Sequence, residues 1–200
     1  NTWEYTSEYS PDIVSSELIY TVSFADEEKI VLSAWDNMLR HKYDESSWLE
    51  RSGIEKYAEK YGIVVVTPNA EQSFYSNMKK GYDYYDYIAK ELPQFIRSTF
   101  NVSDKREDNF VAGLSMGGYG ALKLALKEPD TFCAGAGLSA CCDWSDSHYS
   151  DFHVSIYGKP ECPQEDDLFY LARLQKENPN RPRLYMAMGT EDFLYDEAQP

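Results

Sequence analysis

The sequence is short of basic charge and contains no long hydrophobic run. It has 19 Lys and Arg against 34 Asp and Glu, which gives a formal net charge of −15. Phosphate backbones and anionic lipid surfaces repel such a chain, so the composition argues against nucleic-acid and membrane partners. No apolar run approaches the length needed to cross a bilayer, which argues against a transmembrane span.

Cysteine is scarce, and its spacing is unlike that of a metal site. Cys133, Cys141, Cys142 and Cys162 form no CxxC pair, and the two adjacent residues are poorly placed to bridge each other. We expect reduced thiols and a cytoplasmic location, although a chain that starts at Asn1 leaves a removed signal peptide open. The sequence also has no phosphate-binding glycine loop, no His or Cys metal cluster and no basic stripe, so phosphoryl-transfer, zinc and nucleic-acid roles lack support.

Strands and helices alternate along the chain, and this order predicts an α/β fold. The predicted strands cover residues 17–24, 29–35, 63–68, 109–114, 132–140 and 183–189. The predicted helices cover residues 46–62, 82–100, 116–129 and 164–177, with Pro93 expected to kink or restart the second. Helices of this length between strands imply right-handed crossovers and a mainly parallel sheet. We therefore predict one three-layer α/β domain over residues 1–200.

The stretch "NFVAGLSMGGYGALKLALKEP", residues 109–129, sets a serine between two glycines. An apolar strand ends at Ser115 and a good helix former follows, which is the context of a nucleophile held on a strained strand-to-helix turn. Such a turn tolerates only small neighbours, and Gly113 and Gly117 meet that demand. The Met116 amide, at the start of the helix, would then stabilise an oxyanion. The alternative is a chance Gly-x-Ser-x-Gly pattern in a bend, since the bare pattern is common.

Longer motifs around this turn resemble a known family. "REDNFVAGLSMGGYGALKLAL" and "GTEDFLY", together with "SWLERS", "VVVTPNAEQSFYSNM" and "YDYYDYIAKELP", are similar to the esterase D group of α/β-hydrolases. The nearest likeness is to the tributyrin esterase and feruloyl or acetyl esterase branch, with S-formylglutathione hydrolases as more distant relatives. The similar stretch runs from about residue 47 to residue 195, which is most of the chain.

The resemblance implies a serine carboxylesterase that cleaves short acyl, acetyl or phenolic esters and needs no metal or organic cofactor. Ser115 would be the nucleophile. Asp192 would be the acid that orients a histidine, because it follows the strand "RLYMAMG" and comes after Ser115 in the chain. Glu191 is the alternative carboxylate. A turn aspartate without a catalytic role is the competing interpretation of Asp192.

Two parts of the family pattern are missing. The family places its histidine after the acid, but His41, His148 and His153 all precede Asp192. At the oxyanion loop His41 is followed by lysine instead of glycine. Either the fold continues with a further strand, helix and histidine outside these residues, or the chain is an inactive relative that acts as a binding protein. We favour the first explanation. We also expect His148 and His153 to be surface or cap-region residues.

Aromatic residues follow several predicted elements, at the sheet edge where such folds bind ligands. Trp48, Phe74 and Tyr75 are candidates for lining an acyl or aryl pocket, although core packing explains each of them equally well. The partner expected from the resemblance is a small-molecule ester. The sequence leaves open whether copies associate into a homo-oligomer.

Overall fold

The computed structural model describes residues 2–5, 19–22, 29–34 and 47–196. Its strands are β1 (Thr2–Tyr5), β2 (Ile19–Val22), β3 (Lys29–Ala34), β4 (Ile63–Val66), β5 (Asn109–Leu114), β6 (Ala134–Leu138) and β7 (Arg183–Ala187). Its α-helices are α1 (Ser47–Arg51), α2 (Ile54–Tyr61), α3 (Tyr84–Asp86), α4 (Leu92–Thr99), α5 (Met116–Lys127), α6 (Ser150–Tyr157) and α7 (Leu168–Leu174).

The centre of the fold is a parallel five-stranded sheet in the order β4-β3-β5-β6-β7. The alternation of strands and helices predicted this arrangement, because every crossover carries the chain back to the same end of the sheet. A separate antiparallel pair joins β1 to β2, and β2 lies alongside β4. The carboxyl ends of all five parallel strands therefore meet at one edge. The predicted fold class is confirmed.

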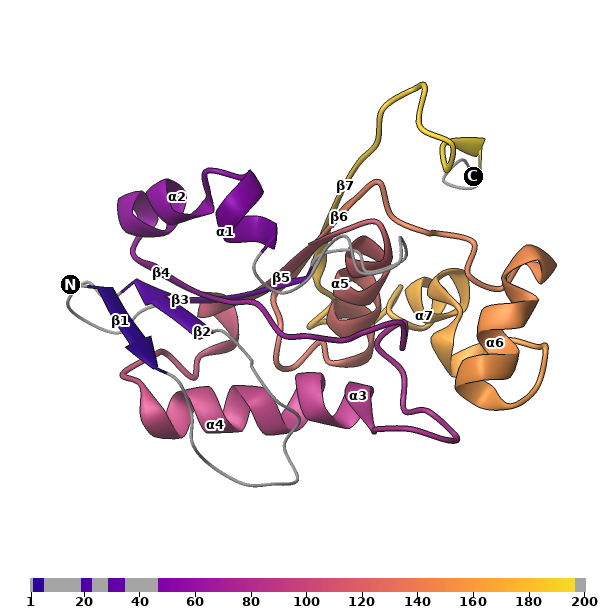
Figure 1. Cartoon of the computed structure of the whole chain (residues 1–200), viewed down its shortest axis with the longest axis horizontal. Helices are drawn as coiled ribbons and strands as arrows, with labels where there is room; N and C mark the ends of the chain where they lie inside the picture. Colours follow the sequence, from indigo (N-terminus) through magenta and orange to yellow (C-terminus); the bar gives the residue numbers. More distant parts are fainter. Residues whose placement is uncertain (1, 6–18, 23–28, 35–46, 197–200) are drawn as a thin grey trace.

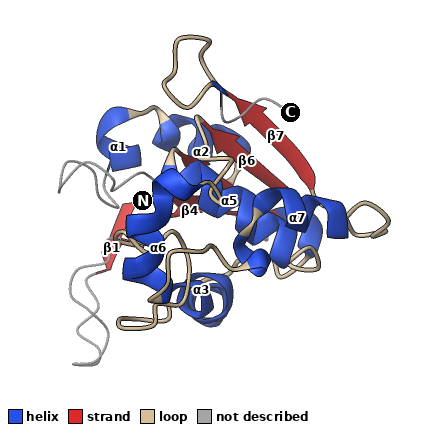
Figure 2. Ribbon diagram, turned by 90° about the vertical axis from the view of Figure 1, so that its right-hand side faces the viewer, coloured by secondary structure: helices blue, strands red, loops and turns tan. Residues whose placement is uncertain are grey.

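Helices pack on both faces of this sheet. Figure 1 shows α1 and α2 on one side and the long helical segment that ends in α4 on the other. A continuous hydrophobic core includes residues from β4, β5 and α5, among them Val64, Val111 and Leu122. Figure 2 shows α5 and α7 packed beside each other along the same face. The turn that carries Ser115 is thus part of a three-layer scaffold.

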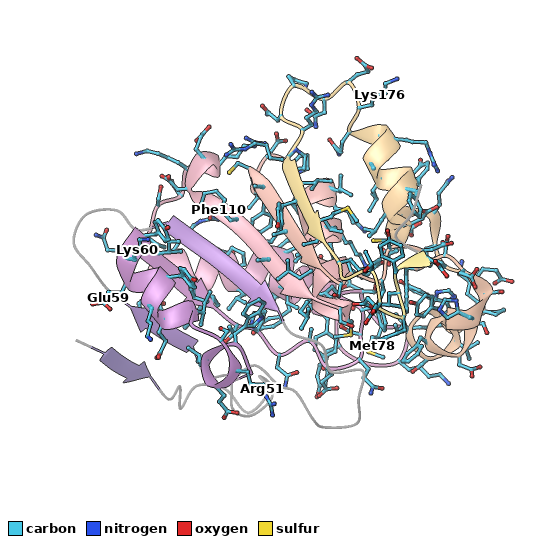
Figure 3. All side chains as sticks on the ribbon, turned by 90° about the horizontal axis from the view of Figure 1, so that it is seen from above. Arg51, Glu59, Lys60, Met78, Phe110 and Lys176 are labelled. Carbon is cyan, nitrogen blue, oxygen red and sulfur yellow. The ribbon has the colours of Figure 1, made fainter. Side chains whose placement is uncertain are left out.

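The other face is left partly open over β5, β6 and β7. A hollow of about 410 Å³ lies there, lined among others by Phe110, Ala136 and Tyr185. Figure 3 looks onto the molecule from above and labels Phe110 on β5. Because β7 is the last strand of the sheet, its side chains are largely exposed, and Tyr185 keeps 62% of its surface accessible.

The predicted restart of the helix at Pro93 is confirmed. A π-helical turn (Tyr87–Glu91) joins α3 to α4, and α4 starts at Leu92 with the proline in its first turn. No helix was predicted around His148 and His153, but this stretch contains a 3₁₀ turn (Ser147–Tyr149) and α6. The tertiary contacts of α6, described below, stabilise a helix that its short apolar pattern did not reveal.

Candidate active site

Ser115 lies at the tip of the sharp turn that joins β5 to α5. Its φ of 56° and ψ of −118° are a conformation that non-glycine residues rarely adopt. Its N–H donates to the carbonyl of Leu138 at 2.8 Å, and its carbonyl accepts from Tyr119 at 3.0 Å, so the strained backbone is held from both sides. The side chain is half-buried and makes no capping hydrogen bond to the helix.

Small residues around Ser115 allow this turn to close. A Cβ atom built on Gly113 would lie 2.0 Å from the carbonyl oxygen of Gly117, which is far inside contact distance. The first turn of the helix therefore rests directly on the end of the strand. The predicted strained turn is present, and its glycines are needed because two backbone segments meet there.

Met116 begins α5 with a fully buried side chain. As the first helical residue it has an N–H with no intrahelical acceptor, and the positive end of the helix dipole lies at the same point. This amide is therefore available to an oxyanion formed at Ser115. The segment around His41, where the second oxyanion donor was sought, lies outside the described residues.

Asp192 lies in the loop after β7, at the same edge of the sheet as Ser115 and two strands away from it. The N–H of Leu194 donates to its Oδ1 at 3.0 Å, which fixes the carboxylate. Among the described residues no donor contacts its Oδ2. The neighbouring Glu191 is exposed and makes no such bond within the described structure. Asp192 stays the predicted acid.

His153 is not placed to serve as the base. His153 is fully buried, and its two ring nitrogens lie 2.8 Å and 2.9 Å from the carbonyl oxygens of Pro160 and Trp144. The expectation of a surface role for His153 is therefore wrong, because α6 turns this ring into the core. His148 is exposed and pairs with Asp146 at 2.9 Å.

The three aromatic candidates differ in their exposure. Phe74 and Tyr75 are buried, with 0% and 1% of their surface accessible. Phe74 stacks on Trp144 at 3.6 Å between ring centroids, and the Tyr75 ring occupies the space that a Cβ on Gly120 would need. Both therefore pack in the core beneath the sheet edge. Trp48 is half-buried in α1. A pocket-lining role for any of the three stays a prediction.

A buried polar cluster braces α5 beyond the nucleophile turn, and the sequence reading did not identify it. The ammonium groups of Lys123 and Lys127 lie 3.0 Å and 3.1 Å from the same carboxylate oxygen, Oδ1 of Asp166. The hydroxyls of Ser76 and Tyr157 donate to its Oδ2 at 2.9 Å and 2.7 Å. The cluster joins α5 and α6 to the loop after β4. A lysine inside the apolar run "ALKLALK" was the available signal.

The charges of this cluster are strongly perturbed. Burial opposes ionisation of Asp166, but the two ammonium groups and the Tyr157 hydroxyl together outweigh it and lower the pKa to about 2. Burial is also the largest influence on Lys123 and lowers its pKa to about 8, against the attraction of Asp166. The carboxylate is the more firmly ionised partner, because two cations share it.

Three further features of the described residues concern metal ligands, cysteines and membrane spans. Within the described ranges, no cluster of His, Cys, Asp and Glu is arranged to hold a metal ion. All four cysteines are free thiols, and burial raises the pKa of Cys162 to about 12. No helix in the described part of the chain is long and apolar enough to cross a membrane.

Comparison with known proteins identifies the family. Residues 30–200 match the family described as "Putative esterase". The chain belongs to this esterase family. Its resemblance to the esterase D group, carried in the sequence by the motifs around Ser115 and Asp192, is thereby confirmed.

Individual relatives add detail. An acetyl esterase of Caldicellulosiruptor saccharolyticus is 30% identical over 165 residues, which is 75% of this chain and 62% of the relative, so the chain spans less than two thirds of that protein. The substrate-bound fluorophosphonate-binding serine hydrolase F of Staphylococcus aureus is 30% identical with a TM-score of 0.81, over 98% of this chain and 81% of that one. An S-formylglutathione hydrolase of the same organism is 29% identical with a TM-score of 0.78, over 98% and 82%.

Proposed function

We propose that this protein is a serine carboxylesterase that hydrolyses short-chain acyl esters through an acyl-enzyme. Ser115 attacks the ester carbonyl, the Met116 N–H stabilises the oxyanion, and Asp192 orients a histidine that takes the serine proton. Protonation of the leaving alcohol then releases it, and water cleaves the acyl group from Ser115. His153 is not the histidine that this mechanism needs, because backbone carbonyl oxygens lie within hydrogen-bond distance of both its ring nitrogens.

The observation that supports this proposal most strongly is the conformation of Ser115. A left-handed serine costs free energy, and the hydroxyl makes no hydrogen bond within the described structure that would repay the cost. Its place at the carboxyl end of the middle strand of the sheet, before a helix N-terminus, is where a nucleophile needs to stand. Family membership supports the same chemistry.

The substrate we favour is an acetyl ester or one with a similarly short acyl chain. The curated relative that is 30% identical is an acetyl esterase, which supports a small acyl group. A phenolic acyl group would need an open aromatic pocket, yet Phe74 and Tyr75 are buried. We therefore expect faster turnover of p-nitrophenyl acetate than of p-nitrophenyl octanoate or methyl ferulate.

The proposal is tested by p-nitrophenyl acetate turnover of the wild-type protein and of Ser115→Ala. Loss of the nucleophile is expected to lower kcat by at least about 10³-fold. The fold should be unaffected, because alanine removes only a hydroxyl that has no partner. Equal rates in the two proteins would end the esterase interpretation and favour a non-catalytic binding protein. Labelling with a fluorophosphonate probe, expected only with Ser115 present, provides an independent readout.

A further inference from the structure

A second serine lies directly beside Ser115 and shares its unusual features. The register of the parallel strands pairs Leu114 of β5 with Leu138 of β6. Ser115 and Ser139 are therefore the next residues on neighbouring strands, whose backbones run about 5 Å apart. The hydrogen bond from the Ser115 N–H to the Leu138 carbonyl, at 2.8 Å, ties the two strand ends together.

Ser139, like Ser115, is held in the left-handed region, with a φ of 44°. Its N–H donates to the carbonyl of Ala187 at 2.8 Å, which extends the pairing of β6 with β7 beyond the strand. On the other side the first turn of α5 presses on this bend: a Cβ built on Gly118 would lie 2.9 Å from the Leu138 carbonyl and from the Ala140 side chain. A glycine would adopt this φ without strain. The strain at this position therefore comes from the serine side chain.

The side chain of Ser139 makes no interaction in the described structure that would offset this cost. Nothing in the described ranges donates to or accepts from its hydroxyl, and the residue is half-buried at the carboxyl edge of the sheet. Strained residues persist mainly where they serve a site. The edge that Ser139 shares is the one that holds Ser115 on one neighbouring strand and the Asp192 loop after the other.

We propose that Ser139 is a substrate-binding residue of this site, whose hydroxyl donates a hydrogen bond to an oxygen of the ester held at Ser115. The inference rests on the proposed function, since it assigns a residue to the same ester. An ester offers two oxygens, and the amide of Met116 can engage the carbonyl oxygen. A hydroxyl one strand away engages a second polar atom of the substrate and fixes its orientation without taking part in bond breaking.

Two substitutions separate the hydroxyl from the strain. Ser139→Ala removes the hydroxyl and keeps the strained Cβ, whereas Ser139→Gly removes both. Each is expected to raise the KM for p-nitrophenyl acetate about three- to tenfold, the value of one hydrogen bond, with kcat nearly unchanged. Only the glycine variant should raise the Tm. Ser155→Ala, at an exposed position on α6, serves as the control and should change none of these quantities.

The outcomes distinguish this inference from the proposed function. An unchanged KM in both variants, with a higher Tm for Ser139→Gly, would show a purely structural serine and overturn the inference alone. A KM that is normal in Ser139→Ala but raised in Ser139→Gly would assign the effect to the backbone, and a loss of kcat at constant KM would also contradict a binding role. An inactive wild-type protein that resists fluorophosphonate labelling would refute the proposed function, and the inference with it.

Discussion

Helix α5 has two ends of opposite character. At its N-terminus Ser115 is strained, half-buried and without a capping hydrogen bond from its side chain. Two and three turns later, Lys123 and Lys127 share an Asp166 oxygen at 3.0 Å and 3.1 Å in a buried cluster. Polar groups that satisfy one another stabilise a scaffold, whereas a group left without a partner is available to a ligand. The same helix therefore carries a candidate reaction centre at one end and its support at the other.

Aromatic residues connect the buried cluster around Asp166 to the elements near Ser115. The hydroxyl of Tyr119 on α5 donates to the backbone carbonyl of Asp166 at 2.7 Å, and the indole of Trp144 donates to the hydroxyl of Tyr157 at 3.3 Å. Trp144 in turn stacks on Phe74. The cluster thus fixes α6 and the loop after β4 against the helix that positions Ser115, which explains why so many polar groups are buried there.

Of the changes at the two ends of α5, Asp166→Asn is expected to have the largest effect on the free energy of unfolding. Loss of the carboxylate charge leaves two ammonium groups without their counterion, one of them fully buried, and should cost about 3 to 5 kcal/mol of unfolding free energy. Denaturant unfolding measures the change. Asp104→Asn, at an exposed position, is the matched control and should change stability little.

A second variant tests whether unbalanced charge is the cause. Lys123→Met combined with Asp166→Asn should be more stable than Asp166→Asn alone, because no buried ammonium is then left unpaired. If both proteins were equally unstable, the loss would come from packing or from the Ser76 and Tyr157 hydrogen bonds instead.

A smaller effect is expected at the other end of the helix from Gly113→Ala. The added Cβ would lie 2.0 Å from the Gly117 carbonyl oxygen and should push the helix away from the strand. A displacement of about 1 Å at the nucleophile can lower kcat roughly 10²-fold, and the crowding itself should cost about 1 to 3 kcal/mol. Gly189→Ala is the control for stability, because its Cβ would meet nothing within 4 Å. Normal kcat in Gly113→Ala would mean that the turn tolerates rearrangement.

The smallest expected effect is the pH dependence that Asp166 gives to the free energy of unfolding. The pKa of Asp166 is lowered to about 2 from an ordinary value of 3.8, so its ionised form is favoured by folding. This contribution, about 2 kcal/mol, is complete above pH 4 and disappears as the pH falls through 2. The difference in unfolding free energy between wild type and Asp166→Asn should therefore shrink by about 2 kcal/mol between pH 4 and pH 2. A constant difference over this range would contradict the assigned pKa.

The sequence predicted the parts of the molecule that depend on local pattern. The parallel α/β fold, the strained turn at Ser115 and the loop position of Asp192 were all available from strand and helix periodicity and from motif spacing. It did not reveal α6 or the burial of His153, because the partners of the His153 ring lie in the segments before and after the helix and not within its periodic pattern. The ring of His153 is buried by contacts with Trp144 and Pro160.

Periodicity and glycine spacing by themselves predicted the alternation of strands and helices along the chain, and they placed a serine at the end of a strand. Only the tertiary structure decided that this strand is the middle one of the sheet. Tertiary structure alone decided that Ser139 stands beside that serine, because the register between β5 and β6 cannot be read along one strand. It also decided that Lys123 and Asp166 meet, since side chains 43 positions apart form an ion pair only when the packed helices bring them out of water together.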